Sequence, residues 1–351
     1  MAIPYRARQG LRKFFAGLLI LVLLSILLLV CWFLWLNRYV VYSQDGAKLD
    51  FDLSLNYGEG EAPVKPTLGA IPEIHDKTED GDNATGTQFL QFSGYYVTME
   101  ELTESFEETA QKLRKLPKGS TILLELKNVQ GACCYSTAVA SATAKETDSF
   151  SLTMVDELIA ELQGKGHYLI AQIPAFQERA YILENERERV PYGLPKAGGN
   201  GSLWPDYSGK LSCYWLNPIS DGTMTYLFQL VTEIRNLGFD ELVLSDFRFP
   251  ETDQIVFEGD KMQALVDTAA TLVKTCSTEG FAVSFARGNT ELSLPEGRTR
   301  LYMVGVSAAD AAAMAEMSTL SDTAVQLVFL TDSHDPRYDD YSTLRPLDSV
   351  E

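Results

Sequence analysis

The chain has few of the residues on which several common chemistries depend. It contains only three histidines among 351 residues, and no Cys-x-x-Cys pair. A histidine-based metal centre, a structural zinc site or a thioredoxin-like redox centre is therefore not expected. The sequence also lacks a Gly-x-Ser-x-Gly elbow and a glycine-rich phosphate turn, which argues against a serine hydrolase and against a nucleotide-binding sheet. We expect neither a cofactor nor a bound metal.

Basic residues are scarce beyond the first 38 positions. That part of the chain holds 24 basic and 48 acidic residues, a formal charge of −24, without a basic cluster of useful size. Such a surface repels nucleic acid and other anionic polymers. We therefore expect no nucleic-acid partner, and we interpret the acidity as a source of solubility.

Charge is absent from one long run near the amino terminus, FFAGLLILVLLSILLLVCWFLWL, residues 14–36. Its 23 residues can span a bilayer as a slightly tilted helix, and the run is longer than the apolar core of a cleaved signal peptide. Four basic residues precede it and one follows closely, so the positive-inside rule keeps the amino terminus in the cytoplasm. This predicts a cytoplasmic basic tail (1–13), a transmembrane signal-anchor (14–36) and an extracytoplasmic remainder on the cytoplasmic membrane of a bacterium.

The exported part begins with two short segments. Residues 37–56 contain two strand-like runs joined at Asp45-Gly46, which predicts a short β-hairpin. Residues 57–87 mix Gly, Pro and acidic residues with few apolar ones, which predicts a flexible linker. Residues 88–351 then form one large domain. A disulfide between Cys213 and the Cys133-Cys134 pair is compatible with an oxidising compartment, and the sequence leaves this open.

The large domain repeats one join: a helix, a glycine, and then an almost wholly apolar strand. The join occurs at Gly166, Gly238 and Gly280. Glycine closes helices in the left-handed conformation, and uniformly apolar strands fit a parallel sheet covered on both faces. This predicts an α/β fold, a (β/α)8 TIM-like barrel incomplete at its carboxyl end, with a doubly wound open sheet as the alternative. The seven predicted strands lie near 89–97, 121–127, 167–173, 240–245, 281–286, 300–306 and 325–330.

Polar side chains follow these strands, at the end of a barrel where chemistry takes place. Several of them are carboxylates, and glycoside hydrolysis needs two such groups, one to protonate the leaving oxygen and one to attack or to activate water. Polar residues also stand wherever an apolar core stops, so the pattern alone fits both interpretations. The strand-end residues are Glu125, Lys127, Asn128, Gln172, Glu178, Asp246, Arg248, Arg287, Glu291, Asp332, His334 and Asp335.

Three motifs in the stretch 214–250 resemble a known family. The chain reads Trp-Leu-Asn-Pro at 215–218, Gly-Phe-Asp-Glu at 238–241 and Arg-Phe-Pro at 248–250. This order resembles the glycosyl hydrolase domain of bacterial proteins, a family with a barrel of the amylase-like type. The resemblance covers roughly residues 90–335, and it implies a barrel that takes a polysaccharide or oligosaccharide.

The resemblance also implies roles for the strand-end residues. Ser245 stands where the family carries its strand-end aspartate, and Asp246 takes the place of the family's tyrosine. Neighbouring residues of a strand point to opposite sides, so Asp246 can replace that aspartate only if the strand end is bulged or frayed. The implied catalytic residues are Asp246, Glu178 and Glu125, and the implied substrate-binding residues are Arg248, Lys127, Asn217, Trp215, Gln172 and His334.

Two functions from different classes follow. The first is a membrane-anchored, extracytoplasmic glycoside hydrolase-like protein directed at cell-envelope or extracellular polysaccharide. The second is a non-catalytic carbohydrate-binding or envelope-scaffold protein, a pseudoenzyme on a degenerate barrel. Ser245 favours the second, and the number of strand-end carboxylates favours the first.

Overall fold

The computed structural model divides the chain into two compact units, Met1–Asp80 and Gly81–Glu351. In the first unit, β1 (Val40–Ser43) pairs antiparallel with β2 (Gly46–Leu49), inside the range for which a hairpin is predicted. The residues that the structure describes are 40–43, 46–49, 89–185, 192–199, 202–207, 212–287, 293–318, 320–332 and 334–347.

The predicted membrane span, residues 14–36, and the predicted linker, residues 57–87, lie outside the described residues. Within the part of the chain that the structure describes, no helix is long and apolar enough to cross a membrane. The membrane span and the linker therefore stay predictions.

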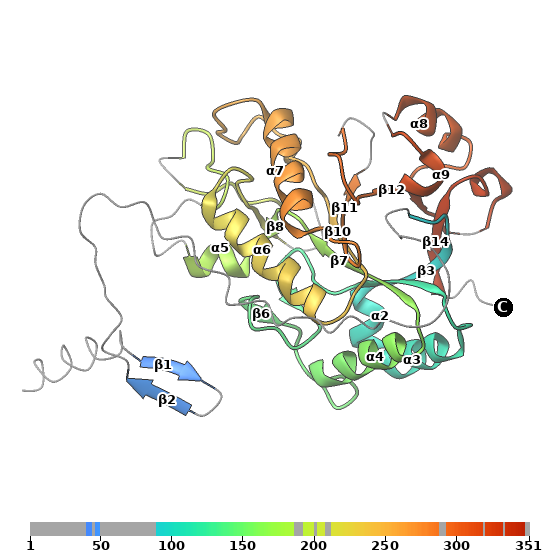
Figure 1. The fold of residues 1–351 in the computed structure, drawn as a ribbon. Coiled ribbons are helices and arrows are strands. Elements are labelled where there is room, and N and C mark those ends of the chain that lie inside the picture. Colours follow the sequence, from blue (N-terminus) through green and yellow to red (C-terminus); the bar gives the residue numbers. More distant parts are fainter. Residues whose placement is uncertain are drawn as a thin grey trace, which may run out of the picture. The chain divides into compact units, whose positions relative to one another are not determined.

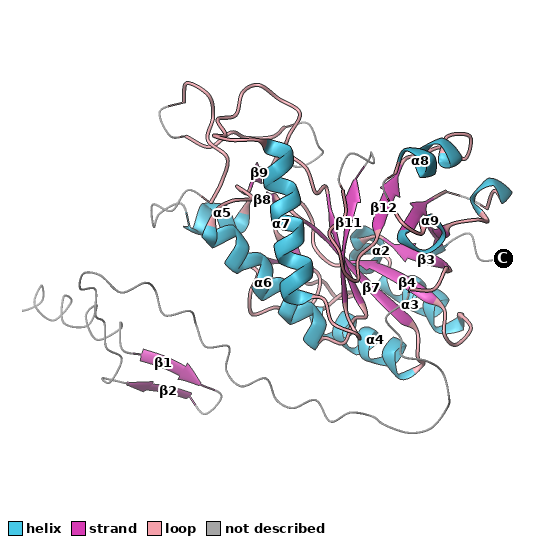
Figure 2. Cartoon of the chain, turned by 45° about the horizontal axis from the view of Figure 1, so that its top comes forward, coloured by secondary structure: helices cyan, strands magenta, loops and turns pink. Residues whose placement is uncertain are grey.

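Eight parallel strands of the second unit form a closed barrel, drawn in magenta in Figure 2. All seven predicted strands are present, and an eighth closes the ring, so the expected gap at the carboxyl end and the open-sheet alternative are both wrong. The eighth strand escaped prediction because its sequence, STLRP, holds a single large apolar residue. In ring order the strands are β10 (Glu241–Ser245), β11 (Ala282–Arg287), β12 (Leu301–Val304), β13 (Leu327–Leu330), β14 (Ser342–Pro346), β3 (Ser93–Val97), β4 (Thr121–Glu125) and β7 (Tyr168–Pro174).

Helices cover most of the outside of the barrel. Figure 1 shows α6 and α7 lying side by side on one flank, with α3 and α4 together on the next. The helices are α2 (Met99–Glu104), α3 (Phe106–Lys115), α4 (Leu152–Gly164), α5 (Ala180–Asn185), α6 (Asp221–Asn236), α7 (Lys261–Cys276), α8 (Ala311–Met317), α9 (Thr323–Gln326) and the 3-10 turn η3 (Pro336–Tyr338). Short strands in the loops are β5 (Ala132–Cys133), β6 (Ala142–Thr143), β8 (Gln177–Glu178) and β9 (Tyr214–Trp215).

Local sequence explains two of the three predicted joins. Gly166 and Gly238 have φ of 71° and 88°, the left-handed conformation expected of a glycine that closes a helix. Gly280 does not have a positive φ. There α7 ends at Cys276, and a bridge between Thr278 and Phe281 makes the turn into β11 instead, so the left-handed join predicted at this glycine is wrong.

The described cysteines of the second unit are buried thiols. Cys133, Cys134, Cys213 and Cys276 are all free, and burial raises the pKa of Cys133 and of Cys213 to about 12. The disulfide that the sequence left open is therefore not formed among these residues.

A buried ion pair fills the amino-terminal end of the barrel. Glu241, the first residue of β10, is fully buried, and its Oε2 accepts hydrogen bonds from Arg300 Nη1 (2.7 Å) and the Tyr168 hydroxyl (2.9 Å). Its Oε1 accepts from the hydroxyls of Ser284 and Tyr302. Four donors thus occupy both carboxylate oxygens. A layer of apolar side chains lies above them, comprising Leu123, Ile170, Val243, Ala286, Tyr302, Val328 and Leu344.

We predict that breaking this pair from one side strongly destabilises the barrel. Arg300→Met leaves a buried carboxylate without its cation, and the loss of one partner of such a pair costs about 3–5 kcal/mol. Chemical unfolding monitored by tryptophan fluorescence measures the change. Lys112→Met, which breaks an exposed pair with Glu108, is the control and should cost less than about 1 kcal/mol. An equal loss in both variants would contradict the prediction.

Candidate functional site

A pocket of about 530 Å3 opens at the carboxyl end of the barrel, and its lining includes Tyr96 of β3, Val304 of β12 and Asp332 after β13. Tyr96 packs with the apolar layer inside the barrel. Side chains two residues apart on a strand share a face, so Glu125 points inward with Leu123. Glu125 stands one layer above the paired Tyr96 and Leu123. We call this end of the barrel the mouth.

Glu125 is a half-buried carboxyl group at the mouth. Its Oε2 accepts a hydrogen bond of 3.1 Å from the amide of Met99, the first residue of α2. Burial raises the pKa of Glu125, and the nearby charges of Glu100 and Glu101 raise it further, while the Met99 amide opposes them. A carboxyl group that holds its proton more tightly than usual is suited to act as a general acid.

Gln172 lies beside Glu125, since the two residues are paired in the register of β4 and β7. Its Oε1 atom is buried and has no hydrogen-bond partner. An unsatisfied buried acceptor is unfavourable, and a hydroxyl group from a ligand would satisfy it. The structure thus brings together two of the predicted residues at the mouth, a carboxyl group and an acceptor.

The end of β10 is bulged at Asp246. Among the described residues, Asp246 is the one non-glycine residue with a positive φ, 49°. Leu244 and Phe247 both pack in the apolar layer between barrel and helices, although strict alternation would put residues an odd number apart on opposite sides. The Phe247 amide still donates to the Ala286 carbonyl of β11, at 3.3 Å. One extra residue is therefore inserted here, and this is the condition under which Asp246 can stand in for an aspartate at position 245.

Asp246 belongs to a cluster beside the mouth. Its side chain is 43% exposed, and its Oδ1 accepts a hydrogen bond of 3.2 Å from Arg248 Nε. The guanidinium of Arg248 lies over the ring of Trp215, 5.3 Å from its centroid. Trp215 is 1% exposed and donates from Nε1 to Asp206 Oδ2 at 2.8 Å. The indole therefore supports Arg248 from below, and its ring face offers a sugar no stacking surface.

Lys127 and Glu178 form a second buried ion pair, each with a side chain 1% exposed. Lys127 Nζ and the Tyr226 hydroxyl both donate to Glu178 Oε2. The amides of Arg179 and Tyr181 donate to Oε1, at 2.9 and 3.3 Å. The Tyr226 contact holds the segment after β7 against α6, the Lys127 contact holds it against the segment after β4, and the two amide contacts lie within the segment itself. In this arrangement Glu178 is closed to solvent and has no free position for a substrate proton.

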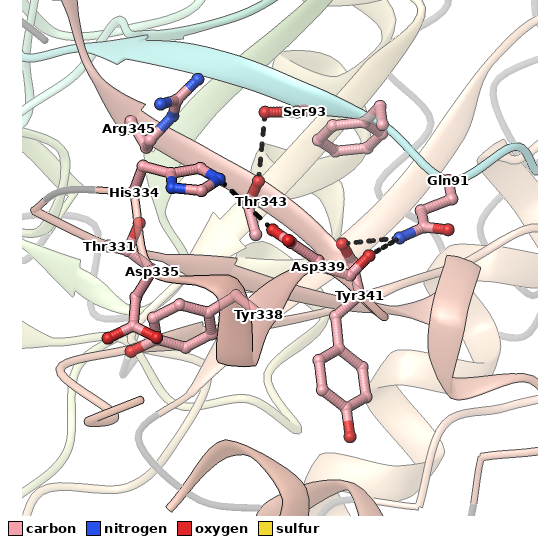
Figure 3. Close-up of a pocket in the computed structure, with 11 residues that line it drawn as sticks. Gln91, Ser93, Thr331, His334, Asp335, Tyr338, Asp339, Tyr341, Thr343 and Arg345 are labelled. Atoms are coloured by element: carbon pink, nitrogen blue, oxygen red, sulfur yellow. Dashed lines mark hydrogen bonds and ion pairs between the residues drawn. The ribbon is translucent and has the colours of Figure 1, made fainter. Parts of the chain in front are cut away.

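The two remaining predicted residues do not line the mouth pocket. Asn217 Oδ1 accepts from the Ile219 amide at 3.3 Å, in the turn that precedes α6. His334 is 61% exposed and lines a groove that adjoins the mouth pocket, where its Nε2 is 3.4 Å from Asp339 Oδ1 (Figure 3).

One mouth residue, Tyr96, was not among the residues that the sequence suggested, whereas Asp332 lines the pocket from the end of β13, where the sequence places a polar group. Burial raises the pKa of Tyr96, and the charges of Asp332 and Glu101 add to this effect. The acids therefore gather around one tyrosine hydroxyl. Alternation along β3 gives a signal for Tyr96, because it follows Gly94 by two positions on the inward face. No cluster of three metal-ligating side chains occurs among the described residues.

A family model described as "Putative glycosyl hydrolase domain" matches residues 94–279, just over half of the chain. The chain belongs to this family. The match runs from β3 to the end of α7, and it includes Glu125, Gln172 and the bulge at Asp246. No curated protein matches the chain.

Solved structures with a similar fold include a hypothetical protein from Ruminiclostridium thermocellum, with 17% identity and a TM-score of 0.43, over 55% of this chain and 96% of that one. A cycloisomaltooligosaccharide glucanotransferase from Paenibacillus sp. has 10% identity and a TM-score of 0.47, over 69% and 38%. A cycloalternan-degrading enzyme from Trueperella pyogenes has 8% identity and a TM-score of 0.49, over 73% and 43%. The match thus spans less than half the length of these two enzymes.

We predict that Glu125 makes the folded domain less stable as the pH rises. Its pKa in the folded state lies above the ordinary value of 4.5, so folding favours the protonated form. The associated stability is present at lower pH and is lost as the pH rises from 4.5 through the folded-state pKa. Glu125→Gln should therefore gain stability relative to wild type between pH 4 and pH 7.

Unfolding free energies of the two proteins across this range measure the effect. The exposed Glu104→Gln, in the neighbouring helix, is the control, and its difference from wild type should change little with pH. A difference between Glu125→Gln and wild type that stays constant with pH would contradict the raised pKa.

Proposed function

We propose that this chain is a membrane-anchored, extracytoplasmic glycoside hydrolase-like protein that acts on cell-envelope or extracellular polysaccharide. The family assignment supports the glycoside hydrolase-like character of the barrel. The uncharged run at residues 14–36 supports the anchor and the orientation. The mouth, with its acids and unsatisfied acceptor, is the place where we assign the ligand.

The bulge at Asp246 is the observation that carries the catalytic part of this proposal. It supplies a half-exposed carboxylate at a strand end whose inward residue, Ser245, cannot serve as one. We assign to Asp246 the role of nucleophile or base, with Arg248 as the residue that positions it. Glu125, with its raised pKa, is the general acid. Two carboxyl groups in unlike surroundings are what glycoside hydrolysis requires.

A second candidate is a carbohydrate-binding protein without turnover. Ser245 favours it, because this residue shares the inward face of β10 with Val243 and offers a hydroxyl where the family carries an acid. The acceptor on Gln172 and the hydroxyl of Tyr96 would serve binding equally well in the absence of hydrolysis.

Turnover assays on the full chain in detergent micelles separate the two candidates. We expect wild type to release reducing ends from envelope or extracellular glycans. Asp246→Asn and Glu125→Gln should each slow release about 10²–10⁴-fold, the usual contribution of one acid or base. The control is Asp253→Asn, an exposed acid in the same loop, which should leave the rate unchanged. Binding without release by wild type would favour the second candidate, and equal rates in wild type and Asp246→Asn would contradict the assigned pair.

Fractionation of bacterial cells tests the membrane anchor. The full chain should sediment with the cytoplasmic membrane, and the domain should be digested by a protease added from outside after the envelope is opened. Removal of residues 1–38 should place the protein in the cytoplasmic soluble fraction, because the export signal is lost with the span. A full chain that fractionates as a soluble protein would contradict the anchor.

A further inference from the structure

A groove of about 470 Å3 lies on the outside of the barrel, at the seam between β14 and β3 (Figure 3). Leu344 points into the barrel with the apolar layer, so its neighbours Thr343 and Arg345 point outward. Ser93 and Tyr95 of β3 are their partners in register. The outer wall of a barrel is usually apolar because helices pack on it. Here hydroxyl groups and a guanidinium line it.

Arg345 is the charged group of this groove that has no ion pair with any side chain in the described part of the chain. It is half-buried, its Nε is buried without a hydrogen-bond partner, and the ring of Tyr95 lies 5.8 Å away. The other charged or titratable groups of the groove engage one another. Asp335 is bound by Arg337 Nη2 at 2.6 Å, and Asp339 faces His334. The groove lining thus holds two carboxylates, each engaged by a neighbouring side chain, and one guanidinium, Arg345, for which the described residues offer no carboxylate.

Two hydroxyl groups lie on the same outer face of the two strands as the guanidinium. Thr343 Oγ1 and Ser93 Oγ lie 3.3 Å apart on the two strands, and Figure 3 shows them on the same side of the groove as Arg345 and His334. Gln91 fixes the opposite rim, since its side chain donates to the carbonyls of Asp339 and Tyr341. A guanidinium flanked by hydroxyl groups matches the geometry and charge of an oxyanion.

We propose that this groove is a second ligand site, which binds a carboxylate or phosphate group through Arg345 with help from Thr343 and Ser93. A bound oxyanion would satisfy the buried Nε, whose lack of a partner is otherwise unfavourable. Neither Glu125 nor Asp246 lines this groove, so the site does not depend on hydrolysis at the mouth, although Thr331, Asp335 and Tyr338 line both the groove and the mouth pocket. Attraction is local, because charges separated by more than roughly 10 Å are largely screened at physiological ionic strength.

Titration calorimetry on the full chain in detergent micelles tests the site. The probes are a glucuronate oligosaccharide for the carboxylate, an oligomer of glycerol phosphate for the phosphate, and a neutral glucan oligomer of similar length. We expect at least one anionic probe to bind wild type more tightly than the neutral one, and the affinity to fall with added salt. Arg345→Gln should weaken that binding about tenfold or more, the usual effect of losing a charge-assisted hydrogen bond.

Arg337→Gln removes the same charge from a neighbouring residue that is already ion-paired, and Glu125→Gln alters the mouth alone. Both should retain anion binding. Thr343→Val removes one hydroxyl donor and keeps the shape of the side chain, so it should also weaken anion binding. This variant tests the proposal if Arg345→Gln fails to fold. Equal affinity of an anionic probe for wild type and for Arg345→Gln, or no binding of either anionic probe to wild type, would overturn the proposal.

Discussion

The ion pair between Glu241 and Arg300 inside the barrel is the interaction on which the rest of the structure depends. Two charges removed from water are tolerated only when every polar atom around them is satisfied. Four donors on Glu241 meet this requirement, and they come from β7, β11 and β12 as well as from Arg300. Arg300 also donates to the Leu90 carbonyl ahead of β3. The pair thereby ties together much of the ring and closes one end of the barrel.

The carboxyl groups at the two ends of the barrel differ in how many of their oxygen atoms accept hydrogen bonds. At the closed end the Glu241 oxygens are fully occupied, and no ligand can reach them. At the mouth, Glu125 has one amide donor and a raised pKa, and the Gln172 acceptor beside it has no partner. Unsatisfied buried polar atoms also occur at the closed end, on His167 and Thr299, so the contrast applies to the carboxyl groups alone. It is one reason for the proposal that the ligand binds at the mouth.

Much of the fold could be predicted because it depends on short-range patterns. Apolar runs indicated seven strands, and a capping box at Thr98 indicated the start of α2. In the structure the Thr98 side chain accepts from the Glu101 amide, and the Glu101 side chain accepts from the Thr98 amide. The closing strand β14 could not be recognised. Its inward residues are Ser342, Leu344 and Pro346, and its outward ones, Thr343 and Arg345, are polar and line a groove. A strand exposed on one side and short of apolar residues resembles a loop in sequence.

The sequence by itself determined the parallel barrel, the family and the positions of acids near strand ends, because these follow from hydrophobic period and motif order. Only the tertiary structure decided what surrounds each acid. Glu178 is at a predicted strand end, yet Lys127 and Tyr226, both distant in sequence, occupy it. Asp246 has a positive φ at the end of its strand, where its side chain is half-exposed and paired with Arg248. Burial and strand register are set by contacts between segments far apart in the chain, and such contacts cannot be predicted from local sequence patterns.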